Sequence, residues 1–280
     1  MNTQINKNIA LVELGGSHTE CMHLQIKALK ESGYKVFIVC NSSLFDDFPD
    51  KQLFDGYQLH QIEHSVKSKI RCILRTRKFF KRNSISSVVF NTSEINIVRN
   101  LLLLPLPAVT NYVGIVHNGK YLESSTSCKM VSRRVKKYFV LSTTVRDCLN
   151  IKLNVKVDAF YPVYFPEYRK ADLPDKHSGD IWITVPGIIS PERKDLDSLL
   201  TSIENTELDK SVHLILLGKI HGDKYPELAG RISSLSKSNN IVMFDSRVPN
   251  DIFSSYMNLS DIVMPLLSME TYGKYRISGS

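Results

Sequence analysis

The sequence predicts an α/β protein built from two tandem, Rossmann-like, doubly wound lobes. Short apolar or β-branched runs alternate with segments of helical spacing along the chain, as in parallel sheets covered by helices. A polar stretch with two prolines interrupts this alternation, and a second series follows it. The length of 280 residues suits one large domain or two small ones. We therefore expect lobes over 1–165 and 180–280, joined by a linker over 166–179.

The first lobe is expected to open with a strand–helix–strand unit. Residues 9–14 (IALVEL) have the composition of a buried strand, and Gly15 and Gly16 follow as a turn. A helix then precedes a second strand at 35–40 (KVFIVC), and such units cross over right-handed into a parallel sheet. The same patterns predict strands at 57–62, 87–90, 111–117 and 138–141, and helices at 66–82, 94–104 and 131–135.

The second lobe repeats the alternation. Strands are expected at 181–185, 213–217, 241–244 and 262–266, with helices near 196–203, 228–235 and 251–258. In open α/β sheets, ligands bind at the carboxyl ends of the strands, where the strand order reverses. Two such lobes would place the site in the cleft between them.

Charge is divided unevenly between the expected lobes. Residues 1–165 hold 23 Lys+Arg and 12 Asp+Glu, a balance of +11, and the remainder holds 13 and 16, a balance of −3. This asymmetry indicates that the first lobe meets an anionic surface, either membrane or nucleic acid. No apolar run reaches the ~20 residues of a membrane span, and the widely spaced cysteines indicate free thiols and a cytoplasmic location.

The expected helix at 66–82 concentrates this positive charge. Val66, Ile70, Ile73, Leu74 and Phe80 fall near one helical stripe. A basic amphipathic helix can lie on anionic lipid, while nucleic acid and a solvated outer face are the alternatives. The membrane-facing candidates are the eight cations of the segment, Lys67, Lys69, Arg71, Arg75, Arg77, Lys78, Lys81 and Arg82.

Several polar residues fall where strands are expected to end. Gly15 and Gly16 would let backbone N–H groups approach a phosphate, or simply form a tight turn. His117 closes one strand and can exchange a proton or bind a hydroxyl. Arg193 and Lys194 precede a helix and would clamp a diphosphate, with Ser190 to Arg193 as turn and cap. Glu270 lies in a polar loop after the last expected strand, where it can accept hydrogen bonds from sugar hydroxyls.

No metal centre is expected. The segment His60 to His64 matches the HxxEH pattern of one class of zinc peptidase, but it alternates like a strand and would not place both histidines on one helical face. His18, Cys21 and His23 cluster without the further ligands that zinc requires.

In this order and spacing, the motifs resemble those of GT-B glycosyltransferases, particularly glycosyltransferase family 4. The matching segments are IALVELGGSHTECMHLQIKALKESGYKVFIVC, VGIVHN, KKYFVLSTTVRDCL, VPGIISPERKDLDSLL, HLILLGK, NIVMFDSRVPNDIFSSYMNLSDIVMPL and ETYGK. The resemblance implies transfer of a sugar from a nucleotide-sugar donor in the second lobe to an acceptor on the first. That transfer would be metal-independent, need no cofactor, and usually proceed with retention at the sugar.

The resemblance also implies individual roles. His117 and Glu270 would act at the donor sugar, and the donor would be bound by Gly15, Gly16, Arg193, Lys194, Glu270, Tyr272 and Gly273. The basic first lobe would then meet a membrane surface carrying a lipid-linked or saccharide acceptor, on the inner face of the membrane, and not nucleic acid.

The sequence departs from the family pattern at three places. Ile188 and Ser278 stand where the family often has Arg and the second Glu of its E-x7-E motif, and family members continue beyond residue 280, so an incomplete second lobe is expected. A catalytically degenerate GT-B protein that binds a membrane or a partner is therefore the alternative function, and a nucleotide-sugar epimerase of the same fold is a weaker one.

Overall fold

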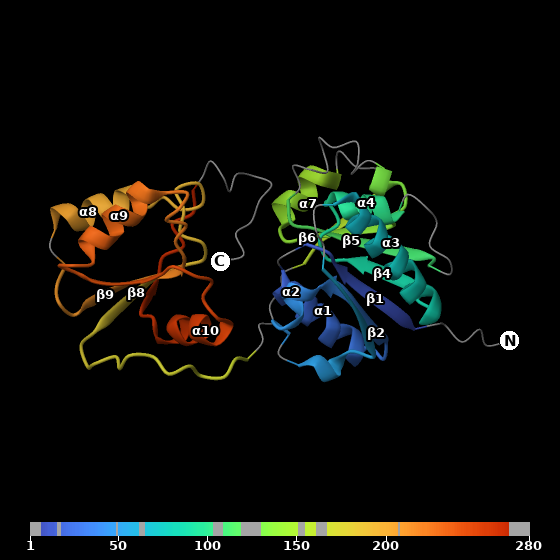
Figure 1. The fold of residues 1–280 in the computed structure, drawn as a ribbon, viewed down its shortest axis with the longest axis horizontal. Coiled ribbons are helices and arrows are strands. Elements are labelled where there is room, and N and C mark those ends of the chain that lie inside the picture. Colours follow the sequence, from blue (N-terminus) through green and yellow to red (C-terminus); the bar gives the residue numbers. More distant parts are fainter. Residues whose placement is uncertain are drawn as a thin grey trace. The chain divides into compact units, whose positions relative to one another are not determined.

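A computed structural model describes most of the chain as two compact units. The described residues are 7–15, 18–48, 50–61, 65–102, 109–118, 130–150, 155–160, 167–206 and 208–268. Contacts divide the chain between Glu167 and Tyr168 (Figure 1). Residues 168–179 contain no helix or strand and belong with the second unit.

The first lobe is a seven-stranded sheet in the order β3-β2-β1-β4-β5-β6-β7, with every neighbouring pair parallel. The strands are β1 (Asn8–Glu13), β2 (Lys35–Asn41), β3 (Gly56–His60), β4 (Ser87–Phe90), β5 (Asn111–Val116), β6 (Lys137–Val140) and β7 (Lys156–Ala159). The helices are α1 (Thr19–Glu31), α2 (Ser42–Phe45), the short 3-10 helix η1 (Lys51–Leu53), α3 (Val66–Arg82), α4 (Asn96–Leu102) and α7 (Thr143–Asn150).

Both faces of this sheet are covered, which explains why its central strands are apolar throughout. In β1, Ile9 and Leu11 pack in one core with α1, whereas Ala10 and Val12 pack in the other, beneath α3, α4 and α7. This alternation is the period of two that a strand imposes on its side chains. Figure 1 shows α1 and α4 on opposite faces of the sheet.

The second lobe is a four-stranded parallel sheet in the order β10-β9-β8-β11. Its strands are β8 (Ile181–Pro186), β9 (Val212–Lys219), β10 (Asn240–Phe244) and β11 (Ile262–Val263), and its helices are α8 (Asp197–Asn205), α9 (Pro226–Leu235) and α10 (Asn250–Leu259). Helices α8 and α9 lie on one face and α10 on the other (Figure 1). Leu214 and Leu216 of β9 face the first layer, and Ile215 and Leu217 face the second.

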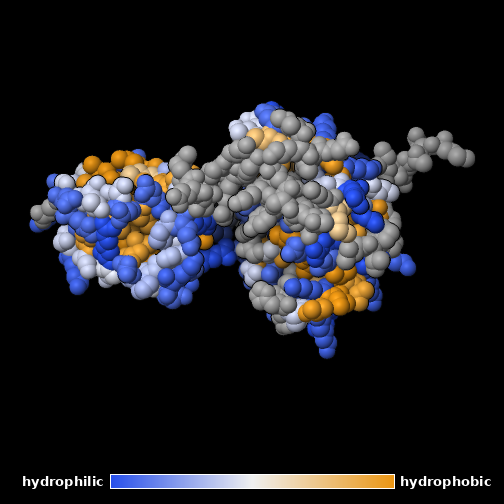
Figure 2. Space-filling model, turned by 90° about the horizontal axis from the view of Figure 1, so that it is seen from above, coloured by the Kyte–Doolittle hydropathy of each residue, from blue (hydrophilic) through white to orange (hydrophobic). Residues whose placement is uncertain are grey.

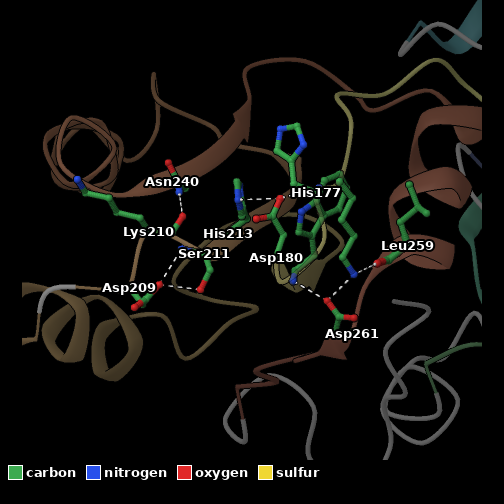
Figure 3. A network of polar contacts seen from close by, with 11 residues as sticks. His177, Asp180, Asp209, Lys210, Ser211, His213, Asn240, Leu259 and Asp261 are labelled. Carbon is green, nitrogen blue, oxygen red and sulfur yellow. Dashed lines mark hydrogen bonds and ion pairs between the residues drawn. The ribbon is translucent and has the colours of Figure 1, made fainter.

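Polar contacts fasten the amino edge of the second sheet (Figure 3). Asp261 Oδ2 accepts hydrogen bonds from the backbone N–H of Trp182, at 2.7 Å, and from Lys176 Nζ, at 2.6 Å. Lys176 also donates to the carbonyl of Leu259. These contacts join the segment before β8 to the end of α10 and stabilise the amino edge of the sheet. Ligands bind at the opposite, carboxyl edge in this class of sheet.

The structure confirms the expected α/β class with two parallel sheets. Several elements differ from expectation. Helix α7 and strand β7 were not predicted, and α4 begins at Asn96 instead of residue 94, because residues 91–94 form a turn. Strand β11 ends at Val263, and Pro265, which has no N–H to donate, follows two residues later.

On the face drawn in Figure 2, patches of hydrophobic residues lie among hydrophilic ones on both units. Within the described ranges, no helix combines the length and the hydropathy that crossing a bilayer requires. The four described cysteines, Cys21, Cys40, Cys72 and Cys148, are free thiols.

Candidate active site

The strand order of the first sheet reverses between β1 and β4. Strands β2 and β3 lie on one side of β1, and β4 to β7 lie on the other. Parallel strands end at one edge, so this reversal brings together the residues that end or directly follow β1, β4 and β5. They are Glu13, Asn91 and His117 with their neighbours, and they form a polar cluster that we call the switch-point site.

Glu13 is the buried carboxylate of this site. It is the last residue of β1 and is fully buried. Its Oε1 accepts from the backbone N–H of Gly15 at 2.6 Å, and its Oε2 accepts from Asn91 Nδ2 at 2.8 Å and Thr92 Oγ1 at 2.5 Å. Burial raises the pKa of Glu13 above its ordinary value, although the three hydrogen bonds favour the charged form.

Asn91 connects Glu13 to two histidines. It is fully buried directly after β4, and its Nδ2 also donates to the carbonyl of His18 at 3.0 Å. Its own carbonyl accepts from His117 Nε2 at 2.8 Å, and its Oδ1 accepts from Gln25 Nε2. One amide side chain and one carbonyl thus set the positions of loops that follow three strands.

His18 and His117 stack face to face. Their ring centroids are 3.7 Å apart and the rings are inclined by 7°. His18 has a left-handed backbone conformation, with φ of 71°, at the start of α1, which is uncommon outside glycine. Because a carbonyl oxygen only accepts, the contact with Asn91 places the proton of the neutral His117 ring on Nε2 and makes Nδ1 an acceptor.

Glu94 holds the backbone beside His117. Its Oε1 accepts from the N–H groups of His117, at 3.0 Å, and Asn118, at 2.9 Å. Burial raises the pKa of this carboxyl to about 7, more than the hydrogen bonds lower it. The site therefore contains two carboxyl groups that burial makes easier to protonate, and a histidine whose ring is fixed by Asn91 and whose backbone is fixed by Glu94.

The second sheet reverses its strand order between β8 and β11, and Lys194 lies there. Its side chain is 2% exposed, and Nζ donates to the carbonyls of Pro186 at 2.5 Å and Pro265 at 2.7 Å. Burial, with a smaller contribution from Arg193, lowers the pKa of Lys194 to about 8. Lys194 is thus a buried tether between the segments that follow β8 and β11, and its predicted contact with a diphosphate stays a prediction.

The prediction that residues 190–193 cap the next helix is wrong. Residues 191–193 form a turn, but α8 begins at Asp197 with Leu196 as N-cap and no side-chain cap. Arg193 is half-buried in that turn, and its carbonyl accepts from the N–H of Ser268. The turn is therefore held against the segment after β11, and the start of α8 lies further along the chain.

Two glycines allow close packing beside Lys194. Gly187 has φ of +87°, a conformation that side chains rarely adopt. A Cβ on Gly218 would lie 1.9 Å from the carbonyl oxygen of Gly187. The ends of β8 and β9 can therefore touch only because Gly218 has no side chain, and Gly187 supplies the backbone conformation.

The remaining predicted site residues have different outcomes. The N–H of Gly15 is already bonded to Glu13, so its predicted phosphate contact stays a prediction. Gly16, Glu270, Tyr272 and Gly273 lie outside the described residues. In the HxxEH segment, His60 ends β3 and bonds to Thr76 Oγ1, while Glu63 and His64 are also outside. No group of three or more His, Cys, Asp and Glu side chains converges as a metal site within the described ranges.

The basic segment forms the expected helix, but its faces differ from the predicted stripe. Cys72, Thr76 and Phe80 face the lobe, whereas Val66, Ile70 and Leu74 are exposed by 72, 52 and 60%. The exposed side of α3 thus carries an apolar ridge next to the cations Lys67, Arg71, Arg75, Lys78, Lys81 and Arg82. The other two predicted membrane-facing cations, Lys69 and Arg77, are half-buried.

Sequence reasoning missed the residues that build the switch-point site. Glu13 ends an otherwise apolar strand and directly precedes two glycines, and a charged residue in that place is a signal of a buried polar contact. Residues 91–94 (NTSE) follow another apolar strand and fell within or beside an expected helix. The edge position of these residues, more than their type, identifies them.

We expect the Glu94→Gln substitution to change how stability depends on pH. Between the ordinary pKa of 4.5 and the raised pKa of about 7, the folded state binds more protons than the unfolded state, so its free energy of unfolding falls as pH rises. The total fall attributable to Glu94 is up to about 3 kcal/mol. Glutamine keeps an acceptor for His117 and Asn118 but does not titrate, so the variant should lose this part of the slope.

Thermal unfolding followed by circular dichroism from pH 4.5 to 8 measures that difference. Glu13 remains in both proteins and cancels in the comparison. Glu192→Gln, at an exposed ion pair with Lys224, serves as the control and should retain the parent slope. Parallel profiles of the parent and Glu94→Gln would show that Glu94 has an ordinary pKa in the folded state.

Replacing Lys194 by methionine should destabilise the second lobe. Methionine fills a similar volume but leaves the carbonyls of Pro186 and Pro265 without their donor, at a cost of about 2–4 kcal/mol. Trp182 is the single tryptophan of the sequence and is buried in β8, so its fluorescence in urea reports on this lobe. The exposed Lys237→Met variant should unfold like the parent, and equal midpoints for both variants would contradict the tether.

No protein-family model matches the chain, and no curated protein matches it. Solved structures do match. A glycosyltransferase from Rickettsia africae aligns over 92% of this chain and 72% of its own, with a TM-score of 0.60 and 16% identity. HepE from Anabaena, in complex with UDP and glucose, aligns over 92% and 73%, with a TM-score of 0.65 and 13% identity.

Sucrose-phosphate synthase from Thermosynechococcus elongatus also aligns, over 92% of this chain and 74% of its own, with a TM-score of 0.65 and 10% identity. Identities this low establish a shared fold and nothing finer. The expected GT-B fold is therefore confirmed, whereas membership of family 4 stays a prediction.

Proposed function

We propose that the protein is a glycosyltransferase that moves a sugar from a nucleotide-sugar donor to an acceptor. The observation that carries this proposal is the fixed His117 at the switch point of a fold shared with HepE, a protein solved with UDP and glucose. A polar group held at the strand reversal is where an open α/β sheet binds its ligand. The order of sequence motifs along both lobes supports the same function.

The second lobe is the proposed donor lobe. Arg193 and Lys194 lie at its strand reversal, and with the turn over residues 191–193 they would give positive potential where a diphosphate sits. Lys194 uses two of its three N–H donors on carbonyls, so Arg193 is the stronger candidate for direct contact. Glu270, Tyr272 and Gly273 would complete the donor site, with Glu270 at the sugar hydroxyls.

The proposed reaction breaks the bond between the anomeric carbon and the phosphate oxygen of the donor. The acceptor hydroxyl forms the new bond to that carbon and loses its proton, and the nucleoside diphosphate leaves as an anion. Arg193 and Lys194 would stabilise that anion by charge, which is the basis for proposing a metal-independent transfer without a cofactor. His117 would bind the donor sugar, and we propose retention from the family resemblance, without assigning a nucleophile.

The first lobe is the proposed acceptor lobe, placed against an anionic membrane surface. Helix α3 exposes an apolar ridge beside its cations, the arrangement by which helices lie in the lipid interface. This surface favours a lipid-linked or growing polysaccharide acceptor over nucleic acid, and a peripheral position on the cytoplasmic face of the membrane.

A second candidate function rests on Ser278. If the missing family glutamate is essential, the protein would bind a membrane or a partner without transferring sugar. That function predicts vesicle binding that survives Arg193→Ala and Glu270→Ala, with no turnover in the parent protein.

Donor binding tests the proposal directly. Titration of the protein with UDP, GDP, ADP and their sugar conjugates should give heat and a rise in melting temperature for at least one base. Arg193→Ala should weaken that binding by about tenfold or more, because it removes a charge-assisted contact, whereas Lys237→Ala should not. Absence of binding by every nucleotide would refute the donor site, and binding without transfer to any acceptor would favour the second function.

Substitutions in the apolar ridge of α3 test whether this helix docks on a membrane. Vesicles containing phosphatidylglycerol should bind the parent, and the combined variant Val66→Ser/Ile70→Ser/Leu74→Ser should bind at least tenfold more weakly, because each buried apolar side chain contributes about 1.5–3 kcal/mol. Met243→Ser/Ile262→Ser, at exposed positions of the second lobe, is the matched control. An equal loss in both variants, or none in the first, would contradict membrane docking through α3.

A further inference from the structure

A polar pocket opens beside α3, away from the residues assigned to the donor. It has a volume of about 330 Å³ and lies at the carboxyl end of β3, between the start of α2 and the middle of α3. Its polar lining consists of Ser42, His60, Gln61, Ser68, Arg71 and Arg75. None of the described residues that line it is a carboxylate.

Two guanidinium groups give the pocket its charge. Arg71 and Arg75 are one helical turn apart, so they lie on the same side of α3. Neither forms an ion pair with any residue that the structure describes. Like charges so close together without a counter-ion are unfavourable, and a bound anion would remove that repulsion.

The other polar groups of the pocket add donors without adding charge. His60 is buried, and its Nε2 lies 3.0 Å from Thr76 Oγ1. Burial and the nearby Arg75 lower its pKa to about 4, so its ring is neutral at physiological pH. Burial likewise raises the pKa of Cys72, in the pocket wall, to about 11. The described lining therefore has a net charge of +2.

We propose that this pocket binds the phosphate group of a lipid-linked acceptor. Guanidinium forks match the oxygen geometry of phosphate, and two of them can neutralise the two charges of a diphosphate that links a lipid to a sugar. The neighbouring hydroxyls of Ser42 and Ser68 can donate to the remaining oxygens. As an acceptor site, this inference rests on the proposed function.

Two features of the fold favour a phosphate borne by lipid over a free one. The same helix exposes Val66, Ile70 and Leu74 next to the arginines, so an acyl or prenyl chain can lie along α3 while its phosphate occupies the pocket. Strand β3 is two strands from β1 in the sheet, about 10 Å at the usual spacing. The pocket and the switch-point site are therefore at the same edge, separated by a distance that the sugar part of an acceptor can span.

Vesicle binding with matched surface charge tests the pocket. Phosphatidic acid exposes a phosphate monoester of about two charges, and phosphatidylglycerol carries one charge on a diester. Vesicles with half the mole fraction of phosphatidic acid thus present a comparable surface charge. The parent should bind the phosphatidic acid vesicles at least tenfold more tightly, and Arg71→Gln/Arg75→Gln should abolish this preference.

Lys78→Gln/Arg82→Gln is the control pair, because it removes two charges from the same helix outside the pocket. It should weaken binding to both vesicle types and keep the preference. Titration with inorganic phosphate and pyrophosphate distinguishes a free ligand from a lipid-borne one: binding of either at micromolar concentration without any vesicle preference would overturn the lipid assignment. Equal behaviour of the two double variants would overturn the pocket itself.

Nucleotide titration on the same samples separates this inference from the proposed function. Donor binding without a phosphatidic acid preference would leave the glycosyltransferase proposal standing and remove the pocket. A preference for phosphatidic acid that depends on Arg71 and Arg75, without binding of any nucleotide, would support the pocket as an anion site and count against the glycosyltransferase proposal.

Discussion

The buried carboxylate of Glu13 is the interaction on which the polar edge of the first lobe depends. It lies at the end of β1, and its two carboxylate oxygens accept hydrogen bonds from groups in the turn after β1 and in the turn after β4. Asn91 also donates to the carbonyl of His18 and accepts from the ring of His117. By holding Asn91, Glu13 therefore helps to position both histidines. Removing such a buried acceptor would leave donors from two loops unsatisfied, which costs about 1–3 kcal/mol for each group.

In the second lobe, a basic side chain, that of Lys194, lies at the strand reversal where the first lobe has the acidic Glu13. Lys194 donates to carbonyls that follow β8 and β11, as Glu13 accepts from groups that follow β1 and β4. In both sheets, a buried ionisable side chain joins the two chain segments that diverge where the strand order reverses. In open α/β sheets ligands bind at this reversal, so in each lobe a buried ionisable side chain fixes the proposed binding edge, at a cost in desolvation.

The fold was predictable from the sequence because the pattern is strong and local. Runs such as KVFIVC and HLILL alternate with amphipathic segments, and their lengths match strands buried on both faces. Strand β7 and helix α7 were missed because the short run KVDA and its preceding helix carry a weak apolar pattern. Pro265, which follows the short strand β11, stood inside the apolar run from which a longer strand was predicted.

The site was less predictable, for a physical reason. Whether a charged residue faces solvent or the interior depends on which strands become neighbours, and the sequence does not state that. Lys194 was predicted to clamp a diphosphate beside Arg193, and the sequence did not show that it is buried and donates to two carbonyls 79 residues apart, those of Pro186 and Pro265. Likewise, the apolar residues of α3 did not all face the core, because Cys72, Thr76 and Phe80 already fill the contact with the sheet.

Hydrogen–deuterium exchange in the presence of a nucleotide sugar that binds is the most direct test of the central claim, that each sheet binds ligand at its carboxyl edge. The account predicts slower exchange in peptides covering residues 13–19, 91–95, 115–118 and 186–196 and no change at the amino edge around Trp182 and Asp261. Saturating binding with no protection in those peptides, or with protection confined to other parts of the chain, would contradict it.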